Sequence, residues 1–157
     1  MGRDPADAVR RFDPGDADAV VDLHERALDA AGTDPADVPG TRDLRRVEAA
    51  YLDTGGEFLV GEAGGAVVAM GGLLVDGPLG ELFRMTVDPA HQREGYGSAI
   101  IEGLEAAARE RGVKRTRLTT GARQESALGF YARHGYAETG RESHGEHELV
   151  GFAKRLD

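Results

Sequence analysis

The sequence of 157 residues contains no cysteine, which excludes disulfides, thiolate nucleophiles and cysteine-based zinc sites. It has only two lysines, Lys114 and Lys154, so arginine supplies nearly all of the positive charge. No apolar run approaches the roughly 18 residues that a membrane-spanning helix needs. The first eleven residues carry charges and lack an apolar stretch, which argues against a secretory signal. From these absences we expect a soluble, cytoplasmic protein that does not interact with membranes.

The composition is that of a globular protein, with 40% hydrophobic and 30% charged residues. The length suits one domain, and neither a repeat nor a long linker divides the chain, so we expect a single domain over residues 1–157. The net charge of −9 comes from 28 acidic and 19 basic residues. Such a charge does not suit binding to nucleic acid. The negative charge would keep the protein soluble or, alternatively, would attract a cationic substrate.

Hydrophobic periodicity and the positions of glycine and proline predict an α/β (α+β) fold with a mixed sheet and helices on its faces. The predicted order is β-α-α-β-β-β-α-β-α-β-β. The strands are expected at 9–12, 57–62, 66–75, 81–87, 115–120, 136–143 and 148–156, and the helices at 17–31, 44–51, 97–111 and 124–134.

One segment has the composition of an anion-binding loop. The predicted strand 81–87 leads through Asp88-Pro89 into a loop that contains Gly95 and Gly97 and opens a helix. The first N–H groups of a helix have no intrahelical partner, and glycine lets a ligand approach the backbone closely. The loop therefore suits a pyrophosphate, although an ordinary strand-to-helix turn would look similar. It lacks the Gly-Lys-Ser/Thr of an ATP-binding loop, and Ile100 stands where a dinucleotide-binding fingerprint has glycine.

The segment Gln92–Gly97 matches the Gln/Arg-x-x-Gly-x-Gly/Ala signature of the GNAT superfamily of N-acetyltransferases. Further along, Ala127–Tyr136 resembles the second motif of that family. Two motifs in the right order are more specific than either alone. The resemblance implies a GNAT-like fold, with a mixed seven-stranded sheet and about four helices. It also implies direct, metal-free transfer of an acetyl group from acetyl-CoA to a primary amine.

The resemblance also implies where acetyl-CoA lies. It would enter between the predicted strands 81–87 and 115–120 where they splay apart, with the backbone of Met85, Thr86 and Val87 along its pantetheine arm. Packing of Met85 and Val87 in the core is compatible with this role. Gln124 stands where many family members have an asparagine near the cofactor. The residues expected to cradle the pyrophosphate are Gln92, Arg93, Glu94, Gly95, Tyr96, Gly97 and Ser98.

Two residues are the catalytic candidates. Tyr131 matches the family tyrosine that protonates the departing CoA thiolate, although a buried aromatic residue on a helix would look the same. Glu81 stands where a subset of the family has its general base, and the alternative is a solvated carboxylate at a strand end. Glu57 and His24 are second choices for the base.

Several alternatives stay open from the sequence. A non-catalytic acyl-CoA-binding sensor would keep the glycine loop and could lack the acid and the base. The segment from His144 to His147 could suggest a metal site, but a polar hairpin tip is the preferred interpretation. The exposed closing strands are compatible with a homodimer. The identity of the acceptor amine, whether small molecule or protein, is not readable.

Overall fold

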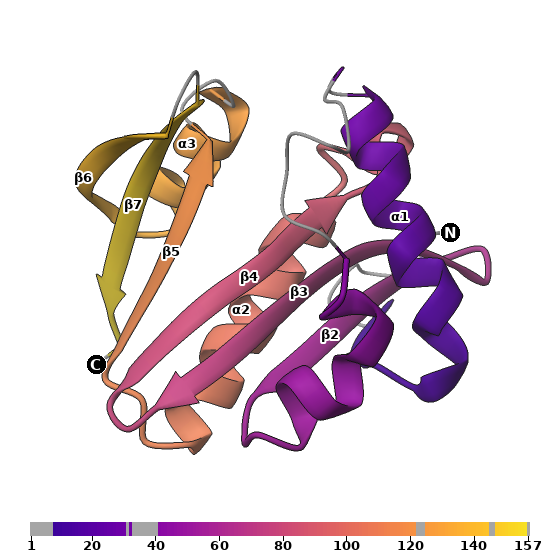
Figure 1. Ribbon diagram of the computed structural model, residues 1–157, viewed down its shortest axis with the longest axis horizontal. Helices are drawn as coiled ribbons and strands as arrows, with labels where there is room; N and C mark the ends of the chain where they lie inside the picture. Colours follow the sequence, from indigo (N-terminus) through magenta and orange to yellow (C-terminus); the bar gives the residue numbers. More distant parts are fainter. Residues whose placement is uncertain (1–7, 31, 33–40, 122–124, 145–146, 157) are drawn as a thin grey trace.

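The computed structural model of the protein describes residues 8–30, 32, 41–121, 125–144 and 147–156. Its centre is a seven-stranded sheet in the spatial order β1-β2-β3-β4-β5-β7-β6 (Figure 1). The strands are β1 (Val9–Arg11), β2 (Glu57–Ala63), β3 (Ala66–Asp76), β4 (Leu79–Val87), β5 (Arg115–Gly121), β6 (Ala137–His144) and β7 (His147–Arg155). Neighbouring strands are antiparallel except β4 and β5, which are parallel. The predicted mixed seven-stranded sheet is therefore confirmed.

The described α-helices are α1 (Ala17–Ala30), α2 (Tyr96–Glu110) and α3 (Glu125–Arg133). Shorter helical segments are η2 (Pro14–Asp16), η4 (Leu44–Arg46), η5 (Glu48–Leu52) and η6 (Pro89–His91). The helix predicted at 44–51 is thus built from two short pieces, the 3₁₀ turn η4 and the π-helical η5. Otherwise the element order follows the prediction. No helix in the described part of the chain is both long and apolar enough to cross a membrane.

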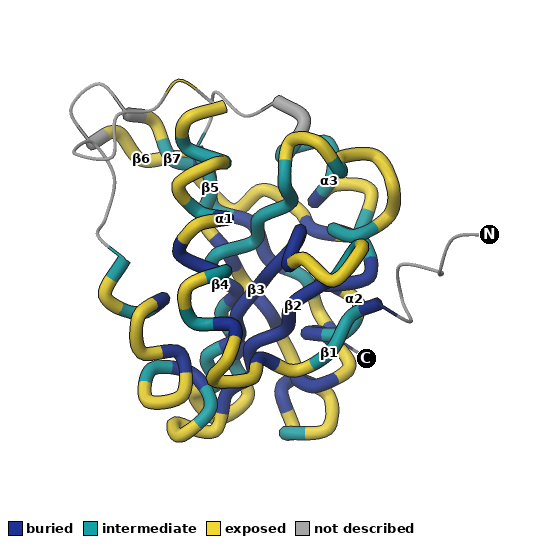
Figure 2. The backbone as a smooth tube through the Cα atoms, turned by 90° about the vertical axis from the view of Figure 1, so that its right-hand side faces the viewer, coloured by how far each residue is buried: buried dark blue, intermediate teal, exposed yellow. Residues whose placement is uncertain are grey.

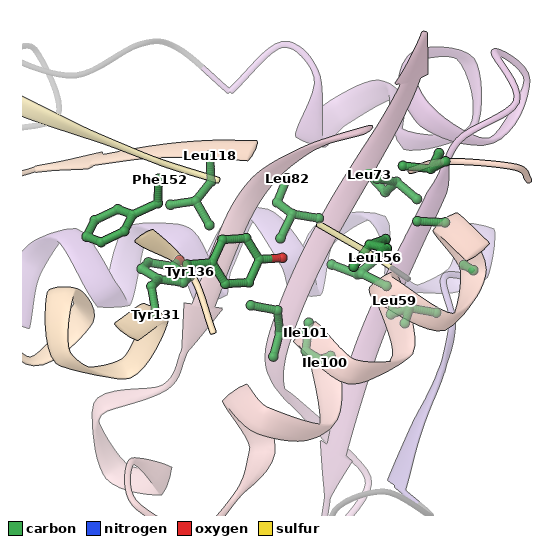
Figure 3. Close-up of a cluster of buried hydrophobic side chains, with 14 of the residues drawn as sticks. Leu59, Leu73, Leu82, Ile100, Ile101, Leu118, Tyr131, Tyr136, Phe152 and Leu156 are labelled. Atoms are coloured by element: carbon green, nitrogen blue, oxygen red, sulfur yellow. The ribbon is translucent and has the colours of Figure 1, made fainter. Parts of the chain in front are cut away.

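Each face of the sheet carries its own hydrophobic core. Along β2, Phe58 and Val60 pack toward α1, whereas Leu59 between them packs toward α2. On β3, Ala69 and Met70 divide between the two cores in the same way. Side chains alternate across a strand, so a strand buried on both faces is continuously apolar in sequence. Figure 2 shows this buried backbone in the middle of the molecule, and Figure 3 shows side chains of the core beside α2 and α3.

The parallel pairing of β4 with β5 is very short. Leu79–Glu81 pair with Arg115–Arg117, and no further ladder pairing joins these two strands in the described residues. The opposite edge of β5 pairs with β7 along its whole length. From Arg117 onward β4 and β5 diverge (Figure 1), and this produces the V-shaped opening that the sequence resemblance predicts.

A bulge in β4 accompanies this opening. Arg84 and Met85 stand together opposite the single residue Gly71 of β3, and such an insertion bends a strand and increases its twist. A Cβ atom at Gly71 would lie 2.6 Å from Sδ of Met85 and 2.7 Å from Cγ2 of Ile100. Glycine at this position therefore lets the bulge pack closely against α2.

A buried polar network adds side-chain contacts across the short ladder between β4 and β5. Glu105 of α2 is 4% exposed and accepts hydrogen bonds from Tyr136 Oη at 2.9 Å and from Lys154 Nζ at 2.9 Å. Oη of Tyr136 also lies 2.8 Å from Oγ1 of Thr116. Helix α2 packs on β2, β3 and β4, whereas Thr116 and Lys154 belong to β5 and β7. The network therefore ties together the two halves of the sheet that the V separates.

Replacing Glu105 with alanine is expected to destabilise the fold. The ammonium group of Lys154 and the hydroxyl of Tyr136 would lose their buried acceptor, which costs about 2–4 kcal/mol. Urea unfolding of Glu105→Ala followed by circular dichroism measures this loss. Glu102→Ala, at an exposed position of the same helix, is the matched control and should change stability by less than about 0.5 kcal/mol. Equal losses in the two variants would contradict a bridging role for Glu105.

Candidate active site

The V opening exposes one backbone edge of β4. Met85, Thr86 and Val87 lie beyond the last residue that pairs with β5, and on their other side Thr86 and Val87 pair with β3. Backbone N–H and C=O groups that do not join a ladder need another hydrogen-bonding partner. The side chains of Met85 and Val87 pack against the core beside α2, so the main chain is what these residues offer to the opening.

The glycine loop lies at the wide end of the V, between β4 and α2. Arg93 and Gly95 both have left-handed backbone conformations, with φ of 66° and 95°. Gly95 is the N-cap of α2, and no side chain caps the helix. The first N–H groups of α2, at Tyr96, Gly97 and Ser98, are therefore left for a ligand or solvent. Successive backbone N–H groups in such a loop form an anion-binding concavity, which the helix dipole strengthens.

Tight packing holds the start of α2 in place. A Cβ atom at Gly97 would lie 3.2 Å from the ring of Phe130 and 3.5 Å from Val87, so α3 and β4 both approach the helix here. Oγ of Ser98 lies 3.0 Å from Nε2 of His134, just after α3. The hydroxyl of Ser98 is thus engaged by His134, and the glycine at position 97 allows the close contact.

Glu81 occupies the apex of the V. It is the last residue of β4 to pair with β5, opposite Arg117. Nε and Nη2 of Arg117 both lie 3.1 Å from Oε1 of Glu81, and the Glu81 side chain is 31% exposed. The structure thus places the predicted base in an ion pair that bridges the two strands where they begin to separate.

A second ion pair fixes the bulge of β4. Arg84 has a φ of 60°, which side-chain-bearing residues rarely adopt, and its guanidinium donates to both carboxylate oxygens of Asp43 at 2.6 and 3.0 Å. Oη of Tyr51 donates to the same carboxylate at 2.6 Å. Burial acts to raise the pKa of Asp43, but the hydrogen bonds from Arg84 and Tyr51 outweigh it and lower that pKa. The ionised cluster stabilises a strained backbone position beside the opening.

His24 of α1 faces this cluster. Burial, and next the charge of Arg84, lower the pKa of His24 below its ordinary value, so the imidazole is neutral near pH 7. Its Nε2 atom is buried and has no hydrogen-bond partner among the described residues. Glu57, the other second choice for the base, binds Arg11 with two hydrogen bonds of 2.9 Å on β2, which is not a neighbour of β5.

Tyr131 of α3 lies in the core between α3 and the sheet. It is 6% exposed, and its ring centroid is 5.8 Å from that of Phe152 and 6.1 Å from that of Tyr136 (Figure 3). Burial raises the pKa of Tyr131 to about 12, so the phenol keeps its proton at neutral pH. Its hydroxyl makes no hydrogen bond with the described residues, so among them this proton has no acceptor.

Most of the predicted site residues form one continuous strip. It runs from Glu81 at the apex, along the free edge of β4, to the loop and the start of α2. Gln124 lies outside the described residues. His144 and His147 are Cα partners at the end of the β6–β7 hairpin, in agreement with the preferred interpretation as a hairpin tip. The described residues contain no group of three or more histidine, aspartate or glutamate side chains that could hold a metal ion.

Sequence reasoning missed three residues of this region: Asp43, Arg84 and Arg117. The alternation of Arg115 and Arg117 along β5 was a usable signal, because parallel pairing places Arg117 beside Glu81. For the contact of Asp43 with Arg84 the sequence offers no local signal, since 41 positions separate the two residues.

The chain matches the acetyltransferase (GNAT) family over residues 19–136. It is 34% identical over 120 residues to N-acetyltransferase family 8 member 2 of Rattus norvegicus, covering 73% of this chain and 50% of the rat protein. It is 33% identical over 127 residues to an IAA acetyltransferase of Azospirillum brasilense, covering 78% of this chain and 80% of the bacterial one. The chain spans about half the length of its mammalian relatives.

Solved structures share the fold. A GNAT-family acetyltransferase of Staphylococcus aureus superposes with a TM-score of 0.82 at 19% identity, covering 95% of this chain and 98% of that one. The protein yncA of Salmonella typhimurium, solved with its cofactor acetyl-CoA, superposes with a TM-score of 0.78 at 21% identity, covering 95% and 93% of the two chains. With the family match over most of its length, the chain belongs to the acetyltransferase (GNAT) family.

Proposed function

We propose that the protein is an acetyl-CoA-dependent N-acetyltransferase that transfers an acetyl group to a primary amine. The observation that carries this proposal is the V between β4 and β5, whose free backbone edge leads to the uncapped start of α2. An extended chain that ends in a pyrophosphate fits this arrangement: the edge offers hydrogen bonds along its length, and the helix offers N–H donors at its end. The N-acetyltransferase names of the relatives support the same activity.

The residues that would hold acetyl-CoA follow from this geometry. The backbone of Met85, Thr86 and Val87 would bind the pantetheine arm, and an N–H near Val87 would face the acetyl oxygen. The backbone from Gln92 to Ser98, through Arg93, Glu94, Gly95, Tyr96 and Gly97, would bind the pyrophosphate. We propose Gln124 as a further contact by resemblance alone. Bound acetyl-CoA supplies a thioester, whose carbonyl carbon forms a bond to the amine nitrogen as its bond to sulfur breaks.

Glu81 and Tyr131 would handle the protons of this reaction. An alkylamine is protonated at neutral pH and must lose a proton before it can attack. The Oε2 atom of Glu81, which Arg117 does not occupy, would accept that proton. The phenol of Tyr131 would donate its proton to the departing sulfur, since burial raises its pKa to about 12 and it carries the proton at neutral pH.

Gly95→Ala is expected to weaken acetyl-CoA binding by about tenfold or more, because a side chain at a φ of 95° strains the loop that would hold the pyrophosphate. Isothermal titration calorimetry with acetyl-CoA measures the change. Gly112→Ala is the matched control, since Gly112 has a φ of 79° at the other end of α2 and a Cβ atom there meets nothing within 4 Å. Similar affinity losses in both variants would show general strain and would contradict the loop as the binding site.

Tyr131→Phe and Glu81→Gln are each expected to lower kcat by about 100-fold or more at pH 7.5, since general acid and base steps have this magnitude. The dissociation constant of acetyl-CoA should stay within about twofold, because neither change touches the pyrophosphate loop. Turnover is measured as CoA release across a panel of amines. Stopped turnover in a variant that binds acetyl-CoA normally would place the changed residue in the chemical step.

Matched controls separate these roles from general damage. Tyr136→Phe removes another buried phenol of the same core together with its hydrogen bond to Glu105, so it measures how a weakened core alone affects kcat of the folded protein. Glu138→Gln removes another strand carboxylate that pairs with an arginine. Both should keep kcat within about threefold. Full turnover in Tyr131→Phe would remove Tyr131 as the acid. Acetyl-CoA binding without turnover of any amine by the wild type would instead favour a non-catalytic sensor.

A further inference from the structure

The ion pair of Glu81 with Arg117 lies on a face of the sheet that is open at β5. Residues that pair across neighbouring strands point to the same face, so Glu81 and Arg117 share the face that α1 covers further along the sheet. In Figure 1, α1 and the short helices lie over β2, β3 and β4. On the same face of β5, Arg115, Arg117 and Thr119 are exposed. An acceptor can therefore reach the ion pair from solvent, at the apex of the V.

In each side chain of the ion pair, one polar atom has no hydrogen-bond partner among the described residues. Both contacts of Arg117 are to Oε1 of Glu81, so Oε2 has no partner among the described residues. Nη1 of Arg117 likewise has no partner there, and the Arg117 side chain is 56% exposed. A carboxylate and a guanidinium thus lie side by side, and each keeps hydrogen-bonding capacity toward the open face.

The charges of an α-amino acid are complementary to those of Glu81 and Arg117. It carries an ammonium group and a carboxylate on one carbon, so its two charges are adjacent and opposite in sign. We propose, on the basis of the proposed function above, that the acceptor is an α-amino acid whose carboxylate binds Arg117 while its amino group faces Glu81. Two charge-assisted contacts in fixed orientation would hold the nitrogen at the apex.

The proton inventory of this arrangement balances. The ammonium group gives one proton to Oε2 of Glu81, and the neutral nitrogen forms a bond to the acetyl carbon as the carbon–sulfur bond breaks. The nitrogen releases a second proton to solvent, and Glu81 then releases the first. The sulfur takes the proton of Tyr131, which solvent replaces. The products are an N-acetylamino acid, CoA as its free thiol, and one net proton. The carboxylate stays ionised throughout and remains bound to Arg117.

The surroundings favour an acceptor that carries a negative group. Although the whole chain has a net charge of −9, both of its lysines and two further arginines line a shallow groove across the start of β5, β6 and the end of β7. These cations are Lys114, Arg115, Arg155 and Lys154, of which Lys154 is already paired with Glu105. A polycationic amine would meet repulsion here, whereas an amino acid with its carboxylate foremost would not.

The test compares matched acceptors: amino acids, the carboxamides of the same amino acids, and the corresponding amines without a carboxyl group. CoA release from acetyl-CoA gives kcat and KM for each. For the wild type we expect kcat/KM of the acids to exceed that of the amides by about tenfold or more. In Arg117→Gln this preference should fall to within about twofold, through a higher KM for the acids with kcat less affected. Arg117→Lys should restore part of it, because a single charge remains.

Arg109→Gln is the matched control. Arg109 has the same charge at an exposed position of α2, away from both the apex and the groove, so the preference for acids should change by less than about twofold. Turnover confined to amides, polyamines or peptide amines would overturn the inference and leave the proposed function intact. A preference for acids that persists in Arg117→Gln would also overturn it. No turnover with any amine would overturn both.

Discussion

The short parallel ladder between β4 and β5 is the constraint on which the rest of the site depends. Three residues on each strand pair, Leu79–Glu81 with Arg115–Arg117, and the strands then separate. In a longer ladder, strand pairing would occupy the backbone N–H and C=O groups that the opening leaves available. A shorter one would leave the two halves of the sheet without a common edge. The buried Glu105 network on the α2 side makes this compromise stable, since it joins the halves by side chains and leaves the backbone of the V free.

Backbone strain gathers around the same opening. The only non-glycine residues with positive φ in the described part of the chain are Arg84 and Arg93, one in the bulge of β4 and the other in the glycine loop. Such conformations persist when surrounding contacts determine them. At Arg84 the contacts are visible, because Asp43, the residue before η4, accepts hydrogen bonds from its guanidinium and from Tyr51 of η5. The short helical segments after α1 therefore influence the shape of β4 beside the opening.

The sequence predicted the element order and the mixed sheet, because these follow from hydrophobic periodicity. The opening between β4 and β5 was predicted only through the resemblance to the GNAT family. It predicted one α-helix at 44–51, where the structure has η4 and η5, since apolar spacing over so short a segment does not separate these helix types. Contacts between residues far apart in the sequence could not be predicted from the sequence. The pairing of Glu81 with Arg117 depends on strand register, and that of Asp43 with Arg84 on how a loop returns to the sheet.

The overall charge and the local charges of this protein act at different ranges. A net charge of −9 opposes the approach of any anion at long range, but salt screens exposed charges beyond about 8 Å at physiological ionic strength. At contact, oriented N–H groups at the start of α2 determine whether an anion is held. The same reasoning applies at the apex, where Arg117 would act on the proposed acceptor only within hydrogen-bonding distance. Local groups alone can therefore serve the two proposed anion sites of an acidic protein, one made of backbone at Gly95–Ser98 and one of a single guanidinium.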